Sequence, residues 1–413
     1  MKLSIHKIQN FIIFSLLFLA AMNFSAKFFY FVFGAFGALL LFRRKIILLP
    51  NVLAYLLLSF LTAAYHSSEP LLSVLRCMAW LLCYLIGFNV TGVRNNRADA
   101  RMDYDCGYSE KICYKVLVVI ACGSFAHYLM NFLLNFNNIF SRNTNDIWTG
   151  TTMAATGQAA IACVMSGLAA AWLFAPPKKM YRVLGILCIV ALLVYNQILA
   201  CRTPLVIFAV LLVVGFVFKV KTSKSSRRKI RFIMGCGAAV AAAVVAVSIN
   251  LFGIRDYLLD SNLFNRFDGT GLGWGESERF DAKLMFLQNA YKYPFGGLHL
   301  REKYGYAHDL WLDGYDEYGI FGVILLLCIT VIGIKDLIKL ITKTNYSNAF
   351  KLTITCIYVA ILVQFCTEPI LAGMAWLFAC YCLINGCIAG LNMAHKKTTG
   401  GLYENTTDQY RIR

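Results

Sequence analysis

The sequence predicts an all-α, polytopic integral membrane protein with about twelve transmembrane helices and one large extracytoplasmic loop. Of its 413 residues, 59% are hydrophobic and 15% are charged, which is less charge than a soluble domain of this size carries. Apolar runs long enough to cross a bilayer recur along the whole chain. One long polar run interrupts this series. Together these observations predict a single membrane domain over 1–413.

Twelve apolar runs define the expected spans. They lie at roughly 8–24, 26–42, 46–65, 71–91, 113–135, 153–175, 182–200, 203–220, 232–252, 319–338, 351–370 and 372–391. The first two are separated only by Asn23, Ser25 and Lys27 and could form a tight hairpin. The N-terminal run has no small-x-small cleavage site, and a second apolar run follows at once. We therefore interpret it as an uncleaved first span rather than a signal peptide.

Basic residues orient these spans. If the N-terminus lies inside, 28 of the 39 Lys and Arg residues fall in inner segments, as the positive-inside rule requires. The polar tail at 394–413 is then cytoplasmic, and the polar run at 253–318, between spans nine and ten, is extracytoplasmic. The net charge of +18 reflects this topology and contact with anionic inner-leaflet lipids. It gives no reason to invoke nucleic acid.

Small residues and cysteines are interpreted as packing residues. Gly and Ala are dense in 153–175 and 235–248, as expected where helices pack closely in lipid. The 15 cysteines lie nearly all in spans or on the inner side, and the large loop has none. This pattern predicts neither a disulfide framework nor a thiolate metal site.

The large loop contains two predicted helices. The segment "SERFDAKLMFLQNAYKYPFGG" predicts a helix from about Glu278 to Tyr291, which Pro294 and the following glycines end. The segment "AHDLWLDGYDEYGIFG" predicts a second helix that leads into the tenth span.

Several arginines are candidates for binding an anionic substrate, because a guanidinium can hold phosphate through two parallel hydrogen bonds. Arg202, in "CRTP", lies between two spans joined by almost no loop, where a charge is costly unless it faces protein or water. It could instead extend to the lipid headgroups. Arg279 begins the loop helix and could instead pair with a neighbouring acid. Further candidates are Arg266, Arg142 and Arg76.

His308 is the best single candidate for proton transfer, because imidazole titrates near neutral pH and can accept a proton from an attacking hydroxyl. Asp309 and Asp313 follow it on the predicted helix, and Glu368 lies at the outer end of a later span; all three are candidate substrate contacts. A lone histidine is often structural, and a carboxylate at a helix end often only faces water. Phosphate-binding Gly-rich loops, H-E-x-x-H and C-x-x-C are absent from the sequence, so we expect no metal and no cofactor.

These features resemble the O-antigen polymerase and O-antigen ligase superfamily of bacterial membrane glycosyltransferases. That family commonly shows an Arg in a tight outer turn, an Arg-x(n)-P-x-x-G pattern in the large loop, and a His-Asn-x-x-Leu…Gly pattern before the next span. The matching residues here are Arg202; Arg279, Pro294 and Gly297; and His308, Leu312 and Gly319. Asp309 replaces the frequent Asn, so the role of an amide does not carry over to that position.

The resemblance implies an inverting, metal-independent glycosyl transfer at the outer face of the bacterial cytoplasmic membrane, in a fold of the C-type glycosyltransferase kind. The donor would be an oligosaccharide on polyprenyl diphosphate, such as undecaprenyl diphosphate. Arginines would stabilise the leaving diphosphate, and His308 would assist the attacking hydroxyl. Membrane lipids, a flippase and a chain-length regulator are the expected partners.

Three functions remain open at this point. A polymerase joins lipid-linked repeat units of O-antigen, capsule or exopolysaccharide, whereas a ligase transfers the glycan to lipid A-core. The form "HDLWLDGYDEYG" looks closer to capsule and exopolysaccharide polymerases, which favours the first. A twelve-span transporter or lipid-glycan flippase is the rival from another class. It does not explain one large outer loop, and it predicts mid-membrane charges, of which the sequence has few.

Overall fold

The computed structural model describes residues 5–23, 32, 34–36, 51–65, 70–91, 106–138, 143–223, 225–260 and 278–409. Within these ranges, the side chains of 5–10, 63, 70–77, 106, 278–279 and 397–409 are not described. Among the described residues, eight helices are long and apolar enough to cross a membrane, and three shorter apolar helices accompany them. The chain is therefore an all-α, polytopic membrane protein, as predicted. The count of about twelve spans stays a prediction, since the run at 26–42 lies mostly outside the described residues.

The chain forms two compact units. Unit 1 consists of Met1–Ser124, Ala282–Lys351 and Phe365–Arg413. Unit 2 consists of Phe125–Asp281 and Leu352–Gln364.

The apolar helices described in unit 1 are α1 (Ile5–Ala21), α3 (Val52–Tyr65), α4 (Pro70–Thr91), most of α5 (Cys106–Leu134), α14 (Leu310–Lys343) and α17 (Ala375–Gln409). Helix α17 packs against α4 and α14, and α3 packs against α4 and α14. A Cβ atom on Gly386 would lie 2.0 Å from the carbonyl oxygen of Tyr84, so the α4 and α17 backbones are in direct contact. Helix α17 continues into the segment predicted as a polar tail, as far as Gln409.

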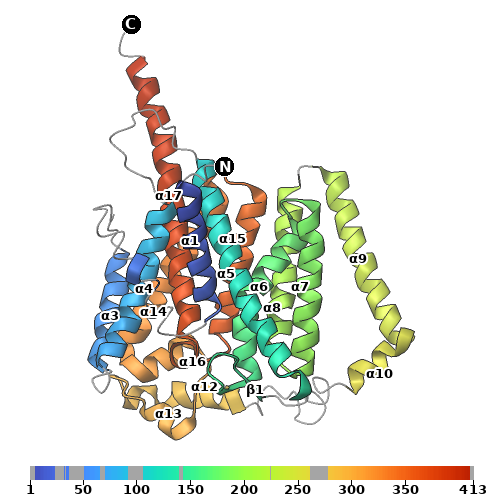
Figure 1. Ribbon diagram of the computed structural model, residues 1–413, viewed down its shortest axis with the longest axis horizontal. Coiled ribbons are helices and arrows are strands. Elements are labelled where there is room, and N and C mark those ends of the chain that lie inside the picture. Colours follow the sequence, from blue (N-terminus) through green and yellow to red (C-terminus); the bar gives the residue numbers. More distant parts are fainter. Residues whose placement is uncertain are drawn as a thin grey trace. The chain divides into compact units, whose positions relative to one another are not determined.

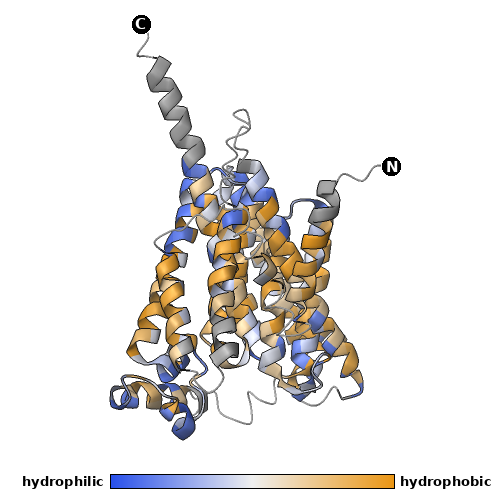
Figure 2. Ribbon diagram, turned by 60° about the vertical axis from the view of Figure 1, so that its left-hand side comes forward, coloured by the Kyte–Doolittle hydropathy of each residue, from blue (hydrophilic) through white to orange (hydrophobic). Residues whose placement is uncertain are grey.

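A layer of short helices closes one end of unit 1. It contains most of α12 (Glu278–Asn289), the 3₁₀ turn η3 (Ala290–Lys292), α13 (His299–Tyr304), the start of α14 and α16 (Ile370–Gly373). We call residues 282–319 and 365–374 the cap layer. In Figure 1 it lies at the opposite end of unit 1 from the first turn of α1 and the last turns of α17. Hydrophobic residues cover the middle of the spans, and hydrophilic residues gather towards their ends (Figure 2).

Both helices predicted in the large loop are confirmed. The first is α12 with η3, and the second is the start of α14, which continues into the span through a kink at Gly319. Helix α13 was not predicted, because its six residues are too few to show a periodic apolar pattern.

Unit 2 combines helices with one small hairpin. It contains the end of α5, η1 (Phe136–Asn138), β1 (Asn143–Asn145), β2 (Thr152–Ala154), α6 (Ala155–Phe174), α7 (Lys179–Ile198), α8 (Thr203–Thr222), α9 (Ser226–Ser248), η2 (Leu251–Gly253), α10 (Ile254–Leu259) and the middle of α15 (Asn348–Phe365). The strands pair antiparallel, with Thr144 opposite Met153. Their polar sequences lack the alternation that predicts a strand.

The two Gly/Ala-rich segments behave differently. A Cβ atom on Gly167 of α6 would lie 2.5 Å from the Cα of Ile357, which confirms the close packing predicted for 153–175. Helix α9 has no buried residue, and Gly235 and Gly237 meet no atom within 4 Å. The prediction of close packing for 235–248 is therefore wrong within the described chain. Small residues permit close approach, but a neighbouring helix must also be there to use it.

Candidate functional site

The cap layer has its own small apolar core. Phe286 of α12, Leu300 of α13 and Ala307 are buried together, and Leu312 and Tyr315 of α14 pack against them, as do Tyr293 and Tyr304. Most of these side chains come from α12, α13 and the start of α14, so the core fixes these three helices together.

The glycines of the two loop motifs form a junction between backbones. The Ile320 amide donates to the Pro294 carbonyl at 2.9 Å. Gly296 and Gly319 both have positive φ, at +76° and +68°. A Cβ atom on Gly319 would lie 2.6 Å from the Cα of Phe295, and one on Gly296 would lie 2.6 Å from the Gly319 amide nitrogen. Only glycine fits both the dihedral angles and the close approach, so "YPFGG" and "YGIFG" dock against each other at the start of the span.

Both aspartates predicted to contact substrate accept hydrogen bonds from backbone amides. Asp309 is the N-cap of α14 and accepts from the amides of Trp311 and Leu312. The buried Asp313 carboxylate accepts from the amides of Ala307 and Asp309, at 3.1 and 3.2 Å. These bonds fix the turn that carries His308.

Asp316 holds α13 in the same way, and an arginine that sequence reasoning missed lies beside it. Asp316 accepts from the amides of Leu300 and Arg301. The Arg301 Nε lies 3.4 Å from Asp316 Oδ2, and its Nη2 lies 3.6 Å from Glu317 Oε2. Its guanidinium carbon is 4.5 Å from the centroid of the Tyr306 ring. The signal that could have revealed Arg301 is a basic residue shortly before an acid-rich helix.

His308 faces Glu368 across the cap layer. The His308 Nδ1 lies 3.8 Å from Glu368 Oε2; the imidazole is 28% exposed and the carboxylate only 2%. His308 has φ of +53°, a conformation that a non-glycine residue adopts only where its surroundings impose it. Glu368 stands in the connection between α15 and α16, directly before Pro369.

Lys283 of α12 links the two segments that carry this pair. Its Nζ donates to the Cys366 carbonyl at 2.7 Å and lies 3.4 Å from Asp309 Oδ2. Cys366 is two residues before Glu368, and Asp309 follows His308. Lys283 thus fixes both members of the pair relative to α12.

The His308–Glu368 arrangement suits proton transfer. A buried carboxylate beside one ring nitrogen can orient the imidazole and stabilise the imidazolium that forms when the other nitrogen takes a proton. The separation of 3.8 Å is longer than a hydrogen bond. Such contacts are often long before substrate binds.

The predicted arginines are described to different extents. Arg202 belongs to unit 2, where it is half-buried and directly precedes α8. The turn before it is closed by the bond from the Cys201 amide to the Asn196 carbonyl, at 2.9 Å. Arg76 and Arg279 lie in α4 and α12, but their side chains are not described. Arg142 and Arg266 lie outside the described residues.

Unit 2 contains a second His–carboxylate pair, which sequence reasoning missed. His127 Nε2 of α5 lies 2.7 Å from Asp146 Oδ2, and both side chains are buried. Asp146 follows β1 and also accepts from the amides of Trp148 and Thr149. Burial alone would raise the pKa of Asp146, but the hydrogen bonds from His127, Thr149 and Trp148 outweigh it and lower the pKa to about 2.

Two asparagines extend this contact between α5 and the hairpin. Asn131 accepts from the Ile147 amide at 2.9 Å. Asn135 exchanges two hydrogen bonds with the backbone of Asn145, at 2.8 and 2.9 Å. His127, Asn131 and Asn135 are spaced four residues apart and share one helix face. This polar stripe in an apolar span was visible in the sequence.

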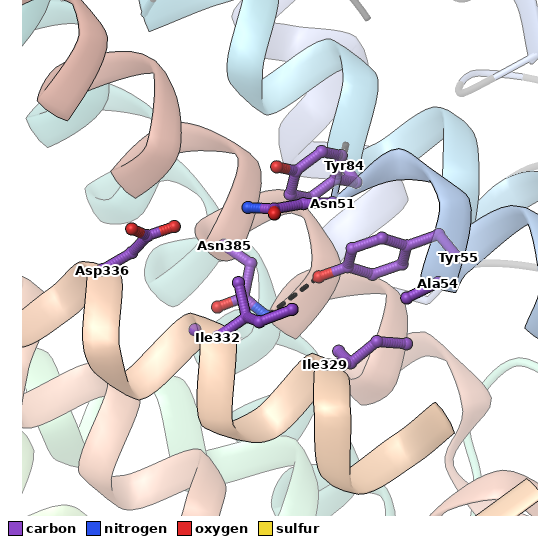
Figure 3. A pocket seen from close by; sticks show the side chains of 9 residues that line it. Asn51, Ala54, Tyr55, Tyr84, Ile329, Ile332, Asp336 and Asn385 are labelled. Atoms are coloured by element: carbon purple, nitrogen blue, oxygen red, sulfur yellow. Dashed lines mark hydrogen bonds between the residues drawn. The ribbon is translucent and has the colours of Figure 1, made fainter. Parts of the chain in front are cut away.

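A crevice among the spans of unit 1 is too small to bind the expected substrate. Asn51, Tyr55, Tyr84, Asp336 and Asn385 line it together with aliphatic side chains of α14 (Figure 3). The rings of Tyr55 and Tyr84 stack at 4.4 Å, and Asn385 Nδ2 donates to the Tyr55 hydroxyl at 3.1 Å. The space holds about one water molecule. A sugar or a diphosphate does not fit there.

No protein-family model and no curated protein sequence matches this chain. Among the described residues, no group of three or more His, Cys, Asp or Glu side chains is arranged to hold a metal ion. A function is therefore proposed from the site and from the order of the sequence motifs.

Proposed function

We propose that this protein is a polysaccharide polymerase that joins polyprenyl-diphosphate-linked oligosaccharide repeat units at the outer face of the bacterial cytoplasmic membrane. The observation that carries the proposal is the partly exposed His308 imidazole held beside the buried Glu368 carboxylate. A hydroxyl of the acceptor repeat attacks the anomeric carbon of the donor glycan. His308 takes the hydroxyl proton, the bond from the anomeric carbon to the diphosphate oxygen breaks, and polyprenyl diphosphate leaves.

The position of the pair in unit 1 supports this chemistry. Helix α14 runs from the cap layer to an end that carries Lys335, Lys339 and Lys343. The positive-inside rule places that end in the cytoplasm and the cap layer outside. The diphosphate of a lipid-linked glycan lies at the membrane surface, and a base at the end of the spans is suitably placed to serve it.

The other acids at this end support His308 as the base. Asp309, Asp313 and Asp316 each accept hydrogen bonds from backbone amides of the cap layer. Asp313 and Asp316 are only 1% exposed, so an incoming hydroxyl can reach the 28% exposed His308 imidazole more readily. Which arginines bind the diphosphate stays a prediction from the sequence, with Arg202 and Arg279 first and Arg76, Arg142 and Arg266 as further candidates.

A purified assay tests the proposal. Wild type, in detergent or nanodiscs, should lengthen lipid-linked repeats without nucleotide sugar, ATP or an ion gradient, and EDTA should not slow it. His308→Ala should lower the joining rate by about 10²–10⁴-fold, the usual contribution of a positioned base. Its melting temperature should match wild type. His299→Ala is the matched control, because His299 lies in the same layer with a side chain 55% exposed.

Other outcomes would replace the proposal. Joining that occurs only when lipid A-core is the acceptor would identify a ligase. Movement of the lipid across the bilayer without any joining would identify a flippase. Full joining by His308→Ala would exclude the His308–Glu368 pair as the source of the base.

A further inference from the structure

Helix α12 presents an apolar face that the cap layer does not cover. Leu284, Leu287 and Tyr291 follow one another at helical spacing. Leu287 is 61% exposed and Tyr291 is 75% exposed, whereas Phe286, on the opposite side, is 1% exposed and belongs to the cap-layer core. The helix therefore has two apolar sides. One side packs in the protein, and the other faces outward.

This outward face is continuous with the outer surface of a span. Phe295, which is 66% exposed, follows Tyr291 and contacts the backbone of Gly319. The next residue, Ile320, is exposed and bonded to Pro294. Exposed apolar side chains then continue along α14 at Phe321, Ile324, Leu327 and Val331. In a membrane-spanning helix such a surface contacts acyl chains.

The residues that border the face are those typical of a membrane interface. Lys292 Nζ lies 5.6 Å from the Tyr291 ring centroid and donates to Asn289 Oδ1 at 2.8 Å. Tyrosine and lysine side chains with apolar stems and polar ends favour the level of the lipid headgroups. An apolar face bordered in this way fits a bilayer surface better than it fits water.

We propose that the α12 face, formed by Leu284, Leu287, Tyr291 and Phe295, inserts into the lipid leaflet at the cap-layer end of the spans. The apolar side chains lie at the boundary of headgroups and acyl chains, and Lys292 lies among the phosphates. The continuity with α14 is what favours lipid over a second copy of the chain or a partner protein. The inference does not depend on the polymerase reaction. If both hold, α12 and Lys283 fix the His308 turn at the depth of a lipid-borne diphosphate.

Fluorescence quenching in nanodiscs tests this insertion on the full chain. An environment-sensitive fluorescent amino acid is placed at Leu287 and, as a control, at Glu302, whose side chain on α13 is 73% exposed. Lipids with a nitroxide high on the acyl chain should quench the Leu287 probe several-fold more strongly than the Glu302 probe. Aqueous iodide should show the opposite order.

Two results would overturn the inference. Equal iodide quenching at both positions would place the α12 face in water. Protection of the Leu287 probe from both iodide and lipid quenchers would show that protein covers the face. Neither result depends on whether the preparation joins repeats, so the insertion and the proposed reaction can fail separately.

Discussion

Each unit holds a histidine against a buried carboxylate, and these two pairs differ in closeness and exposure. In unit 2, His127 and Asp146 are 2.7 Å apart and both buried. In unit 1, His308 and Glu368 are 3.8 Å apart, and the imidazole is partly exposed. The first pair has already formed its hydrogen bond. The second has a ring that solvent or substrate can reach and a partner held at a distance.

The surroundings of the two carboxylates add to this difference. Asp146 accepts several hydrogen bonds from its own hairpin, so its bond to His127 fastens the hairpin to α5. Glu368 stands in a connection that Lys283 braces against α12, opposite a histidine in a strained backbone conformation. In this protein the close contact, with both members buried, fastens a hairpin to a helix. An open contact with a strained member is the better candidate for chemistry.

The largest expected effect is on the joining activity that is proposed for the His308–Glu368 pair. Glu368→Gln removes the charge that stabilises the imidazolium of His308, so the joining rate should fall on the order of 10²-fold. Combined with His308→Ala, it should cause little further loss, because residues that act as one unit are not additive. The measurement is a double-mutant cycle of joining rates. Glu302→Gln, an exposed carboxylate 3.9 Å from His299, is the control. Losses that multiply would show that His308 and Glu368 act independently.

The second effect concerns stability. Asp146→Ala leaves buried His127 without its partner, so the free energy of unfolding should fall by about 3–5 kcal/mol, the usual cost of breaking a buried pair. Thermal melting and protease cleavage within 143–154 would measure it. The exposed Asp256→Ala should change little, because a surface ion pair contributes almost nothing. A folded Asp146→Ala variant that lacks only joining activity would reverse the roles assigned to the two pairs.

The smallest effect is a pH dependence confined to acid. The pKa of Asp146 is lowered from 3.8 to about 2, so the folded state favours the ionised carboxylate. Its stabilisation is complete above the ordinary pKa and is lost as pH falls from about 4 to about 2. The melting temperature of wild type should therefore drop more steeply over this window than that of Asp146→Asn. Parallel curves would mean that another group titrates there.

Local patterns in the sequence were enough to predict most elements. Eight of the described helices are long and apolar enough to cross a membrane, and length and composition alone decide this property. The helix expected from Glu278 is α12, since Pro294 and the glycines end it wherever it packs. Helix α13 and the β1–β2 hairpin escaped prediction, because their own residues carry no periodic apolar pattern and side chains outside them, such as Asp316 and Asn135, hold them.

The sequence by itself determined the membrane class, the main helices and the place of His308 in a polar loop. Composition and periodicity are properties of short segments, so they can be read from the sequence without knowledge of the fold. Only the tertiary structure decided that Glu368, sixty residues later, faces His308, while Asp309 and Asp313 hold backbone amides. It also brought Arg301 to the acids and His127 to Asp146. The role of a charged side chain depends on the groups that lie beside it in the folded protein. Those groups can come from anywhere along the chain, so the sequence does not reveal them.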